Sequence, residues 1–423
     1  MKKILFLFIC FTSFLFADAT IEIIKRMDKL PTIQLQDASG EFIDSDFKNK
    51  FYKVLLADFK VTTYFEVLEN YTQVNYDDIY RSGTSQNDLK ADIILRYKLS
   101  IAPDNSILAT VRLIDSRNAK LKNERVYKIS KMTNYPFLAH TVTMSIVESL
   151  ELPKIDWMGR HIIFSRYTSP KESEIVIADY TLTFQQVLVK GGLNIFPKWA
   201  DNTQDSFYYT SYNLAKPTLY KITLKTGARE QIISSNGMLV VSDVSKDTNR
   251  LLLTMAPKDQ TDIYMYNLRN KQLTQITNFS GVDISGSFIE DESKIIFVSD
   301  RLGYPNIFAQ KIGETRVEQM VYHGRNNAAA STFGNYIVYS SRDKSSEFSG
   351  QTFNLYLIST KTDYIRQLTA TGKNLYPRFS NDGESVIFIK EFASESAIGI
   401  IRLGANKSFH FPLRAGKIQS IDW

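Results

Sequence analysis

Residues 374–390 read NLYPRFSNDGESVIFIK, two apolar stretches separated by the polar segment SNDG. One predicted strand ends at Phe379, and the next runs from Val386 to Lys390. Asp382 suits a tight turn because its carboxylate can accept hydrogen bonds from nearby backbone, and Gly383 because glycine adopts a positive φ without strain. The segment predicts a β-hairpin, and the fold depends on whether this hairpin is one copy of a repeating unit.

The hairpin recurs along the chain. The sequence FIEDESKIIF (288–297) aligns without a gap with FSNDGESVIF (379–388) at an offset of 91 residues, and VSKDTNRLLL (244–253) precedes the former by 44. The bulky residue before the turn recurs at intervals of 45, 44, 45, 46 and 44 residues, at Trp199, Val244, Phe288, Phe333, Phe379 and Trp423. A steady period of this length, rich in short strands, indicates a β-propeller.

Further strands follow within each repeat. Predicted second strands lie at 161–165, 207–211, 251–255, 295–299, 336–340 and 386–390, and predicted third strands at 174–178, 218–222, 262–266, 306–310, 354–358 and 397–401. A fourth strand is clearest at 271–277 and 364–370. The sequence therefore predicts an all-β six-bladed β-propeller over residues 161–423, closed by the C-terminal strand KIQSIDW, which would remove the open sheet edges. Two unrelated β-sandwiches would not explain the unbroken period.

The region before the propeller lacks this period. Phe47, Phe51, Leu55 and Phe59 recur every four residues, which predicts one buried face of a helix, and residues 137–150 predict a second helix. Strands are predicted at 65–69, 91–100 and within 106–121. We therefore expect an α/β domain over residues 31–152, joined to the propeller by a linker at 153–160.

The first 19 residues have the pattern of a secretory signal peptide. Lys2 and Lys3 precede an apolar run of 13 residues, which is too short for an ordinary membrane-spanning helix. A retained membrane anchor is the weaker alternative. The cleavage site could follow either Ala17 or Ala19. The only cysteine, Cys10, lies in this segment, so the mature chain is expected to have no thiol. Residues 20–30 would then form a flexible N-terminal arm.

Composition and motifs argue against several functions. Cleavage after Ala19 would change the formal net charge from +6 to +5, which is too mild over this length to indicate nucleic-acid binding. The sequence has no G-x-S-x-G, H-E-x-x-H, P-loop or G-x-G-x-x-G motif, and its four histidines are widely spaced. We predict no catalytic, cofactor-binding or metal-binding residues, and a structural role for His140.

Two sets of charged residues leave alternatives open. Asp247, Asp291 and Asp382 hold the same place in the repeated turn, which favours a structural role for each. Arg166, Arg301 and Arg342 follow the second strands. They could border a binding face or make ion pairs or hydrogen bonds between blades, and the latter is favoured.

With the repeats and the first domain identified, the whole chain resembles the TolB family of periplasmic propeller proteins of the Tol-Pal system. The resemblance rests on LLADFKVTTYFEVLE (55–69), ADIILRY (91–97) and VRLID (111–115) in the first domain. In the propeller it rests on FVSDRLGYPNIF (297–308), PRFSNDGESVIF (377–388) and the QLT strand endings. Most repeats here depart from the family's S-P-D-G turn.

The resemblance implies a non-enzymatic adaptor located in the periplasm. Its propeller would bind the peptidoglycan-associated lipoprotein Pal, and its N-terminal arm would bind the C-terminal domain of TolA. Such a complex supports outer-membrane integrity and constriction at cell division. The protein is expected to be a monomer that neither binds nucleic acid nor inserts into a membrane. The alternatives are a periplasmic propeller hydrolase and a cell-wall glycan-binding module.

Topology and the resemblance together select candidate contact residues. Loops from a fourth to a first strand share a propeller face with loops from a second to a third strand, and the family uses such loops for Pal. The candidates on these loops are Asn236, Ile284, Asn326, Asn327 and Tyr376. In the arm, Ile21, Glu22, Ile23 and Ile24 could add a strand to TolA, because backbone pairing needs little side-chain identity. The alternatives are loops that only terminate strands and a disordered arm.

Overall fold

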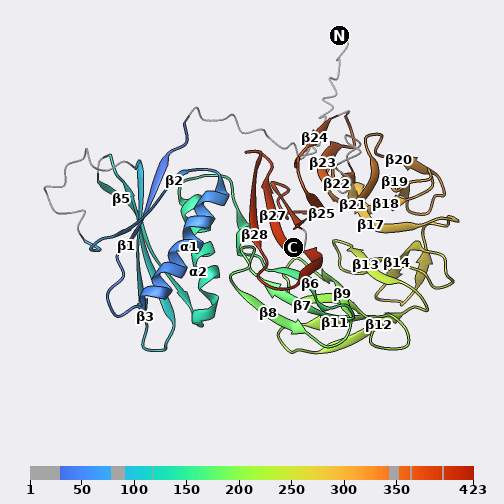
Figure 1. Ribbon diagram of the computed structural model, residues 1–423, viewed down its shortest axis with the longest axis horizontal. Helices are drawn as coiled ribbons and strands as arrows, with labels where there is room; N and C mark the ends of the chain where they lie inside the picture. Colours follow the sequence, from blue (N-terminus) through green and yellow to red (C-terminus); the bar gives the residue numbers. More distant parts are fainter. Residues whose placement is uncertain (1–28, 78–90, 118, 343–351, 363, 393–394) are drawn as a thin grey trace, which may run out of the picture.

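The computed structural model describes residues 29–77, 91–117, 119–342, 352–362, 364–392 and 395–423. Over these residues an α/β domain is followed by a β-propeller, which confirms the predicted order (Figure 1). The expected signal peptide and most of the expected arm, up to residue 28, lie outside the described residues. Within the described part, neither long helix has the length and apolar character needed to cross a membrane.

The α/β domain is built on one five-stranded sheet with the order β2-β1-β3-β4-β5. Strand β1 runs parallel to both β2 and β3, whereas the other neighbours are antiparallel. The strand bounds are β1 Thr32–Asp37, β2 Glu66–Gln73, β3 Ile93–Ile101, β4 Ile107–Asp115 and β5 Lys120–Ile129.

Two helices, α1 (Ser45–Thr62) and α2 (Tyr135–Ser149), lie on the side of this sheet that faces the propeller (Figure 1). Helix α1 begins after Asp44, whose carboxylate accepts a hydrogen bond from the backbone N of Phe47 at 2.9 Å. It ends at Thr62, and Thr63 after it has a left-handed φ of 63°. The apolar stripe predicted for each helix is buried. The buried residues are Phe47, Phe51, Leu55 and Phe59 in α1 and Leu138, Val142 and Ile146 in α2.

The remaining strands form antiparallel units of four, which we number as blades in ring order. The parallel pair Phe353–Lys373 joins two of these units into one eight-stranded sheet. Blade 1 contains β29 Lys417–Asp422, β6 Ile162–Ser169, β7 Glu172–Ala178 and β8 Gln185–Val189; blade 2 contains β9 Asn194–Trp199, β10 Ser206–Ser211, β11 Thr218–Thr223 and β12 Arg229–Ser234; and blade 3 contains β13 Leu239–Val244, β14 Arg250–Met255, β15 Asp262–Asn267 and β16 Leu273–Gln275. Blade 4 contains β17 Asp283–Ile289, β18 Lys294–Ser299, β19 Asn306–Lys311 and β20 Val317–Gln319; blade 5 contains β21 Arg325–Phe333, β22 Tyr336–Arg342, β23 Phe353–Ser359 and β24 Ile365–Gln367; and blade 6 contains β25 Lys373–Phe379, β26 Ser385–Glu391, β27 Ser396–Arg402 and β28 Lys407–Pro412.

The strand nearest the C-terminus pairs with the strand that opens the propeller. Strand β29 runs antiparallel to β6, with Ile421 opposite Phe164 and Asp422 opposite Ile163. The side chain of Ser165 also contacts those of Gln419 and Ser420 at 2.7 Å. These contacts place β29 as the first strand of blade 1, joining residues more than 250 positions apart.

The SNDG segment forms the predicted tight turn between β25 and β26. The Asp382 carboxylate accepts hydrogen bonds from the Ser380 hydroxyl and, at 3.0 Å, from the Glu384 backbone N. Gly383 has a φ of 75°, and a Cβ placed on it would lie 2.3 Å from the Phe333 ring in the corresponding turn of blade 5. Neighbouring blades therefore pack through their turns as well as their strands.

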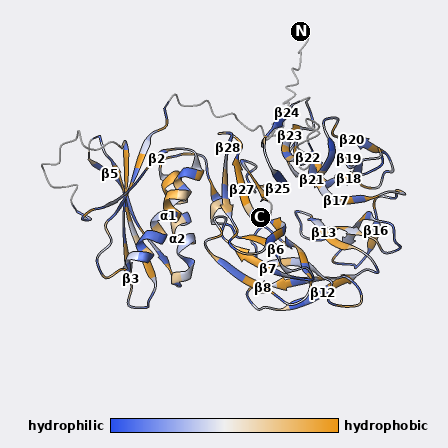
Figure 2. Cartoon of the chain, viewed as in Figure 1, coloured by the Kyte–Doolittle hydropathy of each residue, from blue (hydrophilic) through white to orange (hydrophobic). Residues whose placement is uncertain are grey.

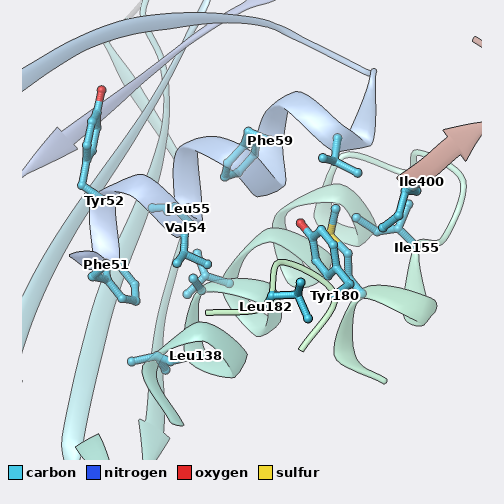
Figure 3. Close-up of a cluster of buried hydrophobic side chains, with 14 of the residues drawn as sticks. Phe51, Tyr52, Val54, Leu55, Phe59, Leu138, Ile155, Tyr180, Leu182 and Ile400 are labelled. Carbon is cyan, nitrogen blue, oxygen red and sulfur yellow. The ribbon is translucent and has the colours of Figure 1, made fainter. Parts of the chain in front are cut away.

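The α/β domain and the propeller share one apolar core. This core joins Phe51 and Phe59 of α1 and Leu138 of α2 to Tyr180 of blade 1 and Ile400 of blade 6 (Figure 3). Hydropathy follows the same division, with apolar residues on the strands of the blades and on the helices, and mainly hydrophilic connecting loops (Figure 2). Burial of this shared apolar surface stabilises the two parts against each other.

Candidate partner-binding face of the propeller

Two sets of loops lie side by side at one end of the propeller. In each blade, a backbone hydrogen bond of 2.9–3.1 Å joins the connection between the second and third strands to the loop that leads to the next first strand. The six donor–acceptor pairs are Ser173–Gly192, Ser235–Pro217, Asp283–Thr261, Asn327–Pro305, Phe353–Gly372 and Leu413–Ser396. We call this the loop face: residues 169–172, 190–194, 212–218, 235–239, 256–262, 276–284, 300–306, 320–327, 368–376, 392, 395 and 413–417.

Irregular first strands leave this face toward the middle of the ring. The pairing of first and second strands shifts register in all six blades. Phe196, Ser285, Asn326, Ala329 and Tyr376 have positive φ values of 51–58° at or near these shifts. Such bulges increase local twist and redirect side chains. The bulges therefore determine the direction of the candidate side chains Ile284, Asn326 and Tyr376.

Four of the five candidate propeller residues retain some exposed surface on the loop face. Asn236 is exposed, and its amide is 3.5 Å from the carbonyl of Pro257. Ile284, Asn326 and Tyr376 are half-buried. Ile284 packs against the core between blades 4 and 5, and Tyr376 against the core shared with the α/β domain. Burial raises the pKa of Tyr376, so its phenol stays neutral at physiological pH.

The fifth candidate, Asn327, is fully buried. Its amide nitrogen lies 2.9 Å from Oδ1 of Asn306 and 2.9 Å from the carbonyl oxygen of His323. The side chain therefore holds two neighbouring loops together from inside. It has no surface to offer a partner in this structure, so its part in the face is to support the loops.

The loop face exposes large apolar side chains that sequence analysis did not select. Each of these residues is between 42% and 83% exposed, and they are Leu214, Val282, Leu302, Tyr322 and Phe392. The loops that carry Val282 and Leu302 are linked by Asp300, whose carboxylate accepts a hydrogen bond from the Val282 backbone N at 2.8 Å. The other large apolar residues exposed on the described propeller lie on or beside outer strands and are Val187, Leu273, Tyr364 and Ile365. Apolar side chains gathered on loops typify protein-binding surfaces.

Cations predominate among the exposed charges of the described loop face. The exposed basic residues are Lys171, Lys190, Lys216, Lys258, Arg325 and Arg414, against the exposed acidic residues Glu172, Asp259 and Glu395. Arg301 is not free for a partner, because its guanidinium lies 3.0 Å from the buried Asp283 carboxylate. Arg166 likewise pairs with Glu174 at 2.9 Å. Both ion pairs lie within a blade, which corrects the expectation that these arginines bridge blades.

The opposite end of the propeller contains a cavity of about 660 Å³. The turns between first and second strands line it, together with charged residues of the inner strands. Lys198 lies 2.8 Å from Asp422 and 3.8 Å from Asp243, and Arg378 lies 3.9 Å from Asp422. The carboxylates of Asp422 and Asp243 also accept backbone hydrogen bonds from the next blade along the ring, each at 2.9 Å. This inner-strand ring of charges therefore ties blades together.

The charged residues of the cavity lining are mainly carboxylates, lysines and arginines. None of its described lining residues is a histidine or cysteine. The repeated turn aspartates act locally, since Asp247 accepts a hydrogen bond from the Asn249 backbone N at 3.2 Å. Across the described residues, no group of three or more His, Cys, Asp or Glu side chains could hold a metal ion.

Comparison with known proteins identifies relatives over the full chain. The family model "TolB beta propeller domain" matches residues 158–423. The chain is 48% identical over 425 residues to the Tol-Pal system protein TolB of Wolinella succinogenes, with both chains fully covered. It is 47% identical to the TolB of Campylobacter jejuni strain RM1221 and 39% identical to that of Helicobacter pylori strain J99, each over 426 residues and both full chains.

A solved structure shows the same fold at lower sequence identity. The crystal structure of TolB from Acinetobacter baumannii superposes with a TM-score of 0.74 and 20% identity. The match covers 93% of this chain and 97% of that one. The fold is thus shared over nearly the whole length, both the α/β domain and the propeller.

Proposed function

Because the chain belongs to the TolB family of Tol-Pal system proteins, we propose that it is a non-enzymatic periplasmic adaptor. In this role the loop face binds the peptidoglycan-associated lipoprotein Pal, and the N-terminal arm binds the C-terminal domain of TolA. The resulting complex supports outer-membrane integrity and constriction at cell division.

The observation that carries the proposal is the set of exposed apolar residues on the loop face. Tyr322 is 83% exposed, and Val282 and Leu302 are 42% and 45% exposed on two loops that are linked by the hydrogen bond between Val282 and Asp300. Aromatic and apolar side chains of this kind anchor protein interfaces, because they bury much surface at low cost in conformational entropy. Backbone hydrogen bonds between neighbouring loops, and the buried side chain of Asn327, hold these loops in place before a partner binds.

The charges of the loop face favour an acidic partner surface. Arg325, beside Tyr304, and Lys258 are among six exposed cations that outnumber three exposed carboxylates. A surface of Pal that combines an apolar centre with carboxylates around it would be complementary. The charges would speed association at low salt and fix the orientation, whereas the apolar anchors would set how long the complex lasts.

The proposed second contact uses the arm. Ile21, Glu22, Ile23 and Ile24 lie outside the described residues, so their role rests on the sequence pattern and on family membership. Alternating apolar residues in an extended segment suit strand addition to a partner's sheet edge.

The decisive experiment is calorimetry of residues 20–423 against the soluble domain of Pal from the same organism. We expect saturable one-to-one binding. The double variant Leu302→Ala and Tyr322→Ala should weaken it about tenfold or more, equivalent to roughly 1.4 kcal/mol, as expected for interface anchors.

A matched control removes exposed apolar residues elsewhere on the propeller. Val187 in β8 and Leu273 in β16 are 39% and 38% exposed, away from the loop face. The double variant Val187→Ala and Leu273→Ala should bind like the unmodified protein. Absence of binding at high micromolar concentrations, or equal loss in both double variants, would contradict the proposal.

A further inference from the structure

A buried charged cluster lies where the α/β domain meets blade 1. It consists of Asp58 of α1, His140 of α2, and Asp179 and Tyr180 of the turn between β7 and β8. All four side chains are fully buried. Figure 3 shows Tyr180 among the apolar side chains of the interface, close to α1 and α2. The cluster therefore spans both parts of the molecule.

The geometry around His140 suits its imidazolium form. Its Nδ1 lies 2.9 Å from both carboxylate oxygens of Asp58, and its Nε2 lies 3.3 Å from Oδ2 of Asp179. A neutral imidazole carries one N–H, so one of its nitrogens would direct a lone pair at a carboxylate. Only the imidazolium form donates to both carboxylates.

The two carboxylates belong to different parts of the chain, and each is held by further donors. Asp58 accepts a hydrogen bond from the Tyr180 hydroxyl, which crosses from the propeller to α1. Asp179 accepts from the backbone N of Thr181 at 2.9 Å and of Phe184 at 2.6 Å, which fixes its turn. His140 is thus the shared cation between an acid of its own domain and an acid of the propeller.

We propose that protonated His140 is an interdomain latch, which fixes the α/β domain on blade 1 and releases part of that constraint when it loses its proton. Opposite charges removed from water attract strongly, and taking away one partner leaves an uncompensated buried charge. This proposal concerns the orientation of the two domains and does not depend on the proposed partners.

The titratable groups of the cluster respond both to burial and to one another. Burial raises the pKa of Asp58, against the charge and hydrogen bond of His140 and the hydrogen bond of Tyr180. Burial acts to lower the pKa of His140, but the Asp58 charge and the hydrogen bonds to Asp179 and Asp58 outweigh it and raise the pKa to about 9. Burial acts to raise the pKa of Asp179, and the hydrogen bond and charge of His140 outweigh it and lower that pKa.

The other titratable groups nearby are His161, Arg160, Arg414 and Tyr135. Burial lowers the pKa of His161, which is therefore neutral at physiological pH. The charge of Arg160 in the linker also acts to lower the pKa of His161. Burial raises the pKa of Tyr135, against the charge of Arg414 in the loop before β29. His140 is therefore the group in this set whose charge changes between neutral and alkaline pH.

Other interdomain contacts would remain after the latch opens. Arg402 of blade 6 donates to the Tyr64 hydroxyl at 3.1 Å, and the shared apolar core continues across the boundary. We therefore expect wider domain motion rather than separation.

The first test titrates all four histidines by NMR in residues 20–423 labelled at histidine. His140 should remain an imidazolium at pH 8 and lose its proton near pH 9. A neutral His140 at pH 7 would overturn the proposal.

The second test measures domain orientation by the distance between two spin labels. The mature chain is expected to lack cysteine, so Val126→Cys in β5 and Leu273→Cys in β16 give one label on each part. At pH 7 the distance distribution should be narrow, and it should broaden at least twofold at pH 10. His140→Gln should broaden it to a similar extent at pH 7 and remove the further response to pH, whereas His323→Gln should behave like the unmodified protein.

The outcomes separate a latch from a purely structural histidine. An unchanged distribution in His140→Gln, or at pH 10 after His140 has titrated, would contradict the proposal. If His140→Gln fails to fold, the pH series on the labelled protein with His140 intact decides between the two results.

Discussion

The Nζ atom of Lys198 lies 2.8 Å from a carboxylate oxygen of Asp422, joining the first strand of blade 2 to the strand that completes blade 1. The second oxygen of Asp422 accepts a hydrogen bond from the backbone N of Trp199 at 2.9 Å. A residue next to the C-terminal position is thereby bonded to two residues more than 220 positions earlier. The contact makes the stability of the ring depend on its last strand.

Asp422→Ala should destabilise the propeller by about 2–4 kcal/mol, because it leaves Lys198 and the Trp199 amide without their main acceptor. The side chains of Lys198 and Asp422 are only 17% and 7% exposed, so solvent screens the pair weakly. Urea unfolding measures the change. Asp291→Asn, which removes the charge of a fully exposed turn carboxylate and keeps a residue type that accepts its φ of 53°, should change stability far less. Equal effects would contradict the role given to Asp422.

Gly383→Ala should cost about 1–3 kcal/mol of stability, since alanine is strained at a φ of 75° and its Cβ would meet the Phe333 ring. Gly404→Ala is the matched control, because a Cβ there meets nothing within 4 Å. Thermal unfolding of the two variants should differ clearly. A neutral Gly383→Ala would show that the turn accepts another conformation.

Asn327→Ala should lower stability by about 1–3 kcal/mol, because the buried Asn306 and the His323 carbonyl lose their shared donor. If this variant also binds the partner more weakly, the cause should be greater mobility of the two loops that Asn327 links. The exposed Asn236→Ala should leave stability unchanged. Unfolding and binding measured on both variants test this division, and an Asn327 variant of normal stability but poor binding would restore Asn327 as a direct contact.

The stability of the protein should depend on His140 at alkaline pH. Its pKa in the folded chain is raised to about 9, above the value near 6.5 for an unfolded chain. The corresponding stabilisation is complete below about pH 6.5 and is lost as the pH rises through 9. Urea unfolding from pH 7 to pH 10 should therefore show a steeper fall for the unmodified protein than for His140→Gln. Parallel curves would contradict a charged His140.

Sequence alone predicted the features that repeat or follow a regular period. Phe47, Phe51, Leu55 and Phe59 mark a helix face because helical periodicity is local, and the SNDG turn requires a glycine with positive φ whatever lies around it. The order of an α/β domain and a propeller follows from such local patterns.

The surface and the buried cluster could not be predicted in the same way. Leu302 and Tyr322 have the same residue types as core positions, and only the folded loops show that they are exposed. Asn327 looked like an exposed loop residue, yet contacts with another loop bury it. Asp58 and Asp179 lie 82 and 39 residues from His140, and no sequence spacing signals that the fold brings the three together.

The most direct test of the adaptor proposal is hydrogen exchange of residues 20–423 with and without the soluble domain of Pal. We expect protection of loop-face segments, above all 276–284, 300–306 and 320–327, with little change in the turns that line the opposite cavity. Protection of the cavity turns, with no protection of the loop face, would contradict the proposal that the loop face binds Pal.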